Sequence, residues 1–148
     1  MKKGIFSVAL FLVSVLVLTG CGGNKLVCTN STTKQAYGYD MEIKQKFSMG
    51  FSDDKLSDAD AVIDVELSDG LYDALKNEGN IDDNMKALAS QLETSMKAEF
   101  GSSVKSVSSS YSGKTVTIKL GLDASGSQNG STREEVKKSF EGNGFSCN

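Results

Sequence analysis

The side chains that could do chemistry in this chain are limited by one absence, because its 148 residues include no histidine. The sequence therefore excludes His-based catalytic triads, histidine metal ligands and a histidine general base. Cys21, Cys28 and Cys147 are its three cysteines. Their neighbours and their spacing predict a role for each.

Cys21 ends a segment that has the parts of a secretory signal. Lys2 and Lys3 give a positive head, and Ile5–Leu18 is an apolar run that two serines interrupt. The run suits a signal peptide and is short for a membrane-spanning helix, which needs about 20 apolar residues. The next residues, Leu18–Cys21 (LTGC), resemble the bacterial lipobox. This implies cleavage before the cysteine, which then carries the lipid; an ordinary signal with a chance cysteine, or an uncleaved anchor, are the alternatives.

A lipid on Cys21 would set the location of the protein. We expect residues 1–20 to be the signal peptide, 21–24 a lipidated tether, and 25–148 a single domain on the extracytoplasmic face of the cell membrane. Two or three acyl chains hold a protein firmly, since each buried CH₂ contributes about 0.8 kcal/mol. The expected partner at this end is therefore membrane lipid.

Cleavage after residue 20 would also change the composition. It leaves 128 residues, which suit one domain, with 14 basic and 19 acidic side chains and a net charge near −5. Nucleic acid needs a basic footprint, so an acidic surface argues against such a partner.

The other two cysteines, Cys28 and Cys147, form an even pair in a compartment that would be oxidising. This pattern predicts one disulfide that ties the two ends of the domain together. A redox-active pair is the alternative, and the chain lacks the C-x-x-C motif that would favour it.

The acidic and hydroxyl side chains give no catalytic or metal site. Between positions 53 and 60 the aspartates lack the spacing and the closing Glu of an EF-hand, so we predict a solvated turn, with a weak divalent cation site as the alternative. The Gly/Ser segment 121–130 carries no phosphate-binding motif, and Ser108–Ser110 has no base at motif spacing. We expect no catalytic residue, metal or cofactor. The aspartates in question are Asp53, Asp54, Asp58 and Asp60.

Period-2 alternation predicts the strands. Residues 25–33, 39–51, 59–67, 104–111 and 115–122 alternate apolar and polar side chains, with Gln45 an exception on an apolar face. In the hairpin of 39–51 and 59–67, a register in which paired numbers sum to 110 satisfies both faces. That register places Lys46 opposite Asp64, Lys44 opposite Glu66 and Phe47 opposite Ile63.

Helical spacing appears in two segments. Residues 81–100 carry an apolar stripe, with Asn80 or Asp82 as the N-cap, and residues 131–142 begin with capping-box spacing. Residues 71–77 suit a short helix, and 144–147 a final strand. The expected fold is α+β in the order β-β-β-α-β-β-α-β, a mainly antiparallel sheet with helices on one face, preceded by the signal-peptide helix.

The two ends of the chain resemble a known family. Residues 20–22 (GCG), 25–29 (KLVCT), 132–136 (TREEV) and 144–148 (GFSCN) are similar to those of small YehR-like bacterial lipoproteins. The resemblance implies the envelope location and supports the bridge, and it supplies no active residues.

These features favour a lipid-anchored binding or interaction module whose ligand, a small molecule or an envelope protein, the sequence does not identify. A structural or accessory lipoprotein of a neighbouring envelope complex is the second hypothesis. A His-free enzyme is the third.

Overall fold

The computed structural model describes residues 25–124 and 131–148. The predicted signal peptide, Cys21 and most of the predicted 121–130 loop lie outside these ranges. Across the described residues, no helix combines the length and the apolar character that crossing a bilayer requires.

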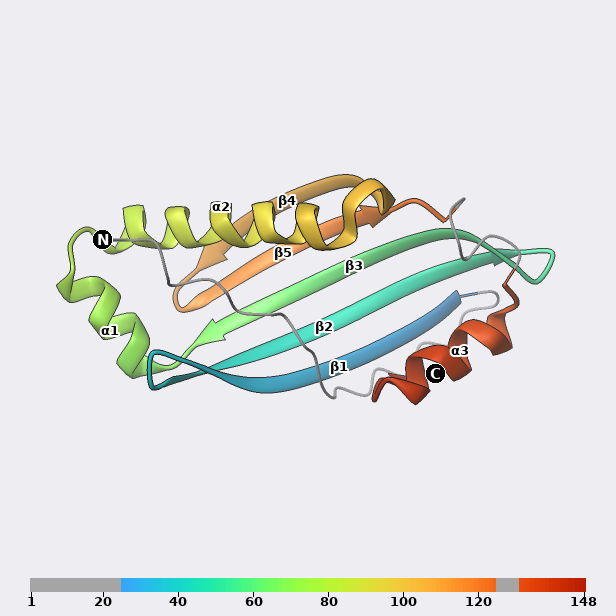
Figure 1. The fold of residues 1–148 in the computed structure, drawn as a ribbon, viewed down its shortest axis with the longest axis horizontal. Helices are drawn as coiled ribbons and strands as arrows, with labels where there is room; N and C mark the ends of the chain where they lie inside the picture. The colour runs from blue at the N-terminus through green and yellow to red at the C-terminus, as the bar shows by residue number, and fades with distance from the viewer. Residues whose placement is uncertain (1–24, 125–130) are drawn as a thin grey trace.

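Six strands form one open antiparallel sheet (Figure 1). Their order across the sheet is β4-β5-β3-β2-β1-β6, so the hairpin of β4 and β5 lies beside β3 and the short β6 lies beyond β1. The predicted α+β class and antiparallel sheet are confirmed. The strands are β1 (Lys25–Ala36), β2 (Tyr39–Ser52), β3 (Lys55–Leu67), β4 (Val104–Ser112), β5 (Thr115–Leu122) and β6 (Ser146–Cys147).

The β2–β3 hairpin has the predicted faces but not the predicted register. Lys44 lies opposite Asp64, two residues away from the predicted pairing. The cause is the turn: Asp53 and Asp54 both have positive φ, so they form a two-residue loop that brings Ser52 opposite Lys55. A slip of two residues keeps every side chain on its face, whereas a slip of one would invert them all.

A bulge completes this register. The pairing of β2 with β3 shifts between Gly50 and Phe51, which adds one residue on β3. A Cβ atom on Gly50 would overlap the Asp58 carboxylate, so the glycine leaves room for that side chain at the bulge.

Within residues 25–124 and 131–148, three α-helices connect the strands. The structure has α1 (Asp69–Asn77), α2 (Ile81–Phe100) and α3 (Arg133–Gly142), with a 3₁₀ turn at Gly101–Ser103. Helix α1 matches the short helix that the sequence suggested at 71–77, which makes two helices between the third and fourth strands where the predicted order held one. Ser68 caps α1 and accepts a hydrogen bond from the Leu71 N–H. Asn80 caps α2, and Thr132 opens α3 with a capping box, as predicted.

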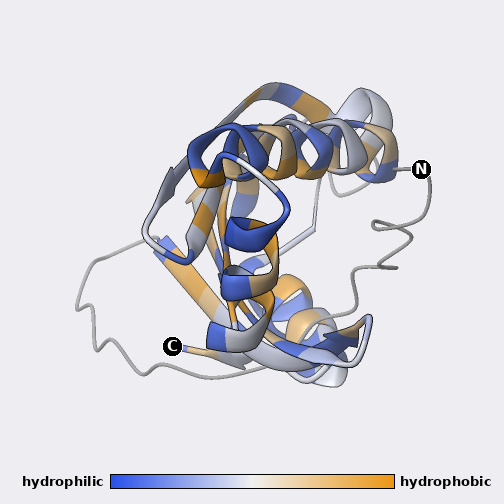
Figure 2. Cartoon of the chain, turned by 90° about the vertical axis from the view of Figure 1, so that its left-hand side faces the viewer, coloured by the Kyte–Doolittle hydropathy of each residue, from blue (hydrophilic) through white to orange (hydrophobic). Residues whose placement is uncertain are grey.

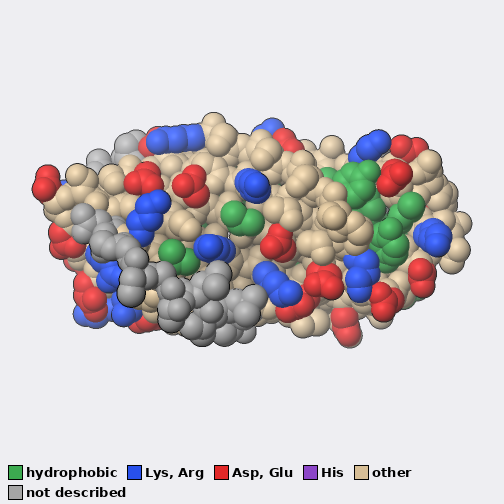
Figure 3. Space-filling view, turned by 180° about the vertical axis from the view of Figure 1, so that it is seen from behind, with side chains coloured by type: hydrophobic (Ala, Val, Ile, Leu, Met, Phe, Trp, Pro, Cys, Tyr) green, Lys and Arg blue, Asp and Glu red, His purple; other side chains and the backbone are tan. Residues whose placement is uncertain are grey.

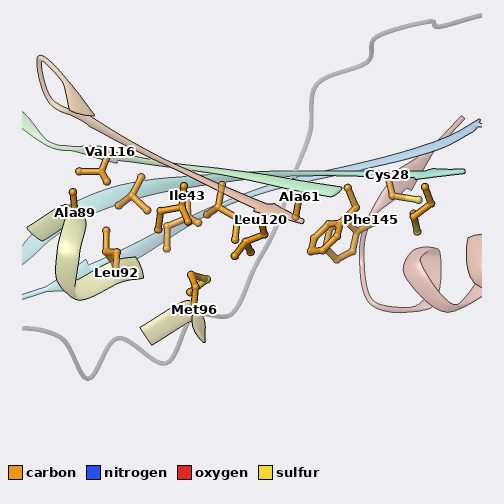
Figure 4. Packing of buried hydrophobic residues seen from close by; sticks show 14 of the residues in the cluster. Cys28, Ile43, Ala61, Ala89, Leu92, Met96, Val116, Leu120 and Phe145 are labelled. Carbon is orange, nitrogen blue, oxygen red and sulfur yellow. The ribbon is translucent and has the colours of Figure 1, made fainter. Parts of the chain in front are cut away.

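The helices cover one face of the sheet. Helix α2 packs against β4 and β5, and α3 packs against β1 and β6, so the two helices lie over opposite margins (Figure 1). Hydrophobic residues lie between helices and strands in the end-on view of Figure 2. In Figure 4, Ala89, Leu92 and Met96 of α2 face the strand residues Ile43 and Leu120.

The opposite face of the sheet is open to solvent. Figure 3 shows acidic and basic side chains interleaved over it, with few hydrophobic ones. The Lys44 ammonium lies 3.3 Å from Glu42 and 3.7 Å from Glu66 on this face. Such mixed pairs on a solvated strand surface contribute little stability each. The helix-covered face is therefore the one that can hold a buried site.

Candidate binding pocket

A cavity of about 220 Å³ lies at one end of the sheet, between the last turn of α2 and helix α3. Its floor is Phe47 and Met49 of β2 with Leu56 and Ala59 of β3. Its walls are Phe100 of α2, Leu122 and Ala124 at the end of β5, and Val136 and Phe140 of α3. Ser103, Asp123 and Ser139 add the polar groups of the lining.

Small side chains on β3 leave the space. Ala59 lies opposite Met49 and Ala61 lies opposite Phe47, at positions where the rest of β3 carries larger apolar residues such as Ile63. Of the two, Ala59 lines the pocket, and so does Phe100, the residue at which helix α2 ends. The pocket therefore arises where a small floor residue lies beside the end of a covering helix.

Helix α3 is fixed against the sheet by aromatic packing. The rings of Phe47, Phe140 and Phe145 are mutual neighbours, with centroid separations of 5.0 to 5.6 Å and tilted or edge-on planes. Such geometry contributes about 0.5–1.5 kcal/mol per pair beyond burial of area. Because Phe47 and Phe140 also line the pocket, this cluster sets the position of its wall.

A disulfide near the end of the chain supports the same pocket wall. Cys28 and Cys147 form the predicted disulfide between β1 and β6, with their Cα atoms 4.2 Å apart. Asn148 extends this pairing, since its N–H donates to the Val27 carbonyl at 3.2 Å and its Oδ1 accepts from the Val27 N–H at 2.9 Å. Arg133, at the start of α3, donates to the Asn148 carbonyl oxygen at 2.9 Å. The bridge is thus part of the scaffold that holds α3.

The size and lining of the pocket restrict what fits. Pockets for drug-sized ligands span about 300–1,000 Å³, and an engineered apolar cavity of about 150 Å³ accepts benzene. At about 220 Å³, this pocket suits one aromatic ring or a short branched alkyl group. Among the polar groups of the lining, the Asp123 N–H donates a hydrogen bond to the Ser103 carbonyl oxygen at 2.7 Å. The Asp123 carboxylate lies 4.0 Å from the Lys105 ammonium.

The predicted acidic segment does not gather into a site. Asp53 and Asp54 form the β2–β3 turn, and the Asp58 carboxylate accepts a hydrogen bond from the Ser57 hydroxyl at 3.1 Å. Within the described part of the chain, no three Cys, Asp or Glu side chains converge as metal ligands. Ser109, from the serine run, donates to Glu93 at 2.9 Å and ties β4 to α2.

Shifted pKa values occur at carboxylates outside the pocket lining. A hydrogen bond from Lys114 lowers the pKa of the Asp69 carboxyl, and one from Lys97 lowers the pKa of Glu93. Burial raises the pKa of Glu99 in the last turn of α2. The first two shifts come from surface ion pairs. The Asp69–Lys114 pair joins α1 to the β4–β5 turn, and the Glu93–Lys97 pair lies along α2.

Two buried polar residues lie among the apolar side chains of the covered face. Asn30 and Gln45 lie directly opposite each other on β1 and β2, and they are only 2% and 4% exposed. Sequence reasoning missed both this pair and the pocket, although Gln45 was visible as the exception in an apolar pattern.

No protein-family model, curated protein or solved structure matches the chain. The resemblance to YehR-like lipoproteins stays a prediction from the ends of the sequence.

Proposed function

We propose that the chain is a lipid-anchored extracytoplasmic binding module, which holds an apolar group of its ligand in the pocket between α2 and α3. The observation that carries this proposal is the pocket itself, about 220 Å³ of mainly apolar lining contributed by segments far apart in the sequence. Concave, mostly apolar sites with a few polar groups are the usual form of ligand pockets.

The position of the predicted anchor supports the proposal. Lys25, the first residue of β1, lies opposite Gly50, and Leu26 lies opposite the pocket residue Met49. Three residues lie between Cys21 and Lys25, so the four residue steps from one to the other span at most about 14 Å of extended chain. A lipid on Cys21 would therefore keep the pocket end of the domain close to the membrane surface, where envelope molecules are concentrated.

The Cys28–Cys147 disulfide supports an oxidising compartment. Such bonds persist outside the cytoplasm and are rare inside it. It also favours a scaffold role over a redox role, because the pair joins opposite residues of adjacent strands, far apart in the chain.

Two measurements test the proposal. Radiolabelled palmitate should enter the full chain in a bacterial host and should not enter the Cys21→Ser variant; an unlabelled wild-type chain would contradict the anchor.

The second measurement tests the pocket. The full chain is labelled with ¹³C-methyl methionine and placed in lipid nanodiscs. Toluene should shift the Met49 methyl signal with a dissociation constant in the millimolar range or tighter, about what a ligand of this size reaches. Ala59→Leu, which fills the floor, should abolish the shift, while Ala98→Leu at an exposed position of α2 should not. No shift of Met49 in the wild-type chain would contradict the pocket.

A further inference from the structure

Two buried amides lie one step along the sheet from the pocket. Gln45 precedes Phe47 on the same face of β2 at a spacing of two residues, about 7 Å. Asn30 lies opposite Gln45, just as Cys28 lies opposite Phe47. The two amides therefore stand on the covered face next to the pocket floor.

Three polar atoms of this pair have no hydrogen-bond partner among the residues that the structure describes. They are the Nδ2 and Oδ1 atoms of Asn30 and the Oε1 atom of Gln45. Their neighbours on the same face of β2 and β3 are the apolar Ile43 and Ile63. A buried amide without a partner is unfavourable, and most buried polar groups in native proteins are paired. Two such residues side by side point to a partner from outside the chain.

The three atoms also restrict the chemistry of that partner. The Asn30 Nδ2 group is a donor and needs an acceptor, whereas Asn30 Oδ1 and Gln45 Oε1 are acceptors and need donors. An ester or a carboxylate only accepts hydrogen bonds, and burying a carboxylate without a cation is costly. A peptide group is neutral and offers both an N–H and a C=O.

We propose that Asn30 and Gln45 form a polar subsite beside the pocket, and that the ligand is a peptide segment. Its aromatic or large aliphatic side chain fills the pocket, and its backbone N–H and C=O groups pair with the two amides. This inference rests on the proposed pocket function and specifies its ligand class.

The test compares three probes on the full chain in nanodiscs, read by the Met49 methyl signal. They are toluene, methyl 3-phenylpropanoate, which only accepts hydrogen bonds, and N-acetylphenylalaninamide, which donates and accepts. The amide probe should bind roughly tenfold more tightly than the ester, the gain of one or two net hydrogen bonds. In the Asn30→Leu/Gln45→Leu variant this advantage should disappear, while the affinity for toluene should stay unchanged.

Thermal unfolding of the variant separates the subsite from a structural role. If the amides serve a ligand, the double leucine variant should unfold at the wild-type temperature or higher, since it removes unpaired buried groups. Gln45→Leu alone serves as a second variant and should lose part of the amide advantage.

Equal binding of ester and amide, with toluene binding intact, would overturn the subsite and leave the pocket standing. A lower unfolding temperature, with the amide advantage retained, would show that the pair serves the fold or holds a buried water only. If toluene does not bind to the wild-type chain, that result would instead overturn the proposed function.

Discussion

Reducing the Cys28–Cys147 bond should lower the free energy of unfolding of the domain by about 5 kcal/mol. The bond closes a loop with a sequence separation of 119 residues, and the chain-entropy relation gives about 4.9 kcal/mol at 25 °C for a loop of that length. Arg133, Asn148 and the aromatic cluster hold α3 without the bond. The reduced domain should therefore stay folded, with a melting temperature lower by roughly 15–20 °C.

Urea denaturation with and without reductant measures this difference. The Cys147→Ala chain is the matched control, since reductant should leave its midpoint unchanged. Hydrogen exchange should report the same loss, because the most protected amides, which exchange through global unfolding, should exchange faster in the reduced chain, and amides of α3 should be accelerated at least as much as those of α2. A difference below about 1 kcal/mol, or unchanged exchange in α3, would refute the view that the bond closes the domain and fixes the pocket wall.

Two further predictions concern the rest of the sheet. Gly50→Ala should destabilise the chain by at most about 1 kcal/mol, because the exposed Asp58 carboxylate that the new Cβ atom would overlap can rotate away, and Asp58→Ala in the same chain should restore most of that loss in a urea double-mutant cycle; additive effects would contradict it. Lys114→Met should raise the pKa of the Asp69 carboxyl toward its ordinary 3.8, measured by NMR titration. Because the pair lowers this pKa in the folded state, its small contribution is present above pH 3.8 and is lost as pH falls through the folded value; an unchanged Asp69 titration would contradict the contact.

The faces of the strands were predictable because burial follows the two-residue period of the sequence. The register was not, since it depended on the backbone of Asp53 and Asp54. A register in which paired numbers sum to 110 needs a longer loop than the two-residue turn that positive φ at both residues forms. The bulge at Gly50 then moves the pairing one residue back toward the predicted register.

Helix caps were predictable from local sequence, and Asn80 and Thr132 confirm them. The pocket was not, because it forms where Ala59, Phe100 and Phe140, distant in the chain, come together. Alternation alone does not reveal that α2 ends beside Ala59. The signal that sequence reasoning passed over was Gln45, a polar residue on an apolar face.

The most direct test of the central claim is an intermolecular nuclear Overhauser measurement on the full chain with toluene. Met49 lines the pocket, whereas Met85 lies buried near the start of α2. The account predicts contacts between the toluene protons and the Met49 methyl group, and none to Met85. Contacts to Met85, or none to Met49 at saturating toluene, would contradict it.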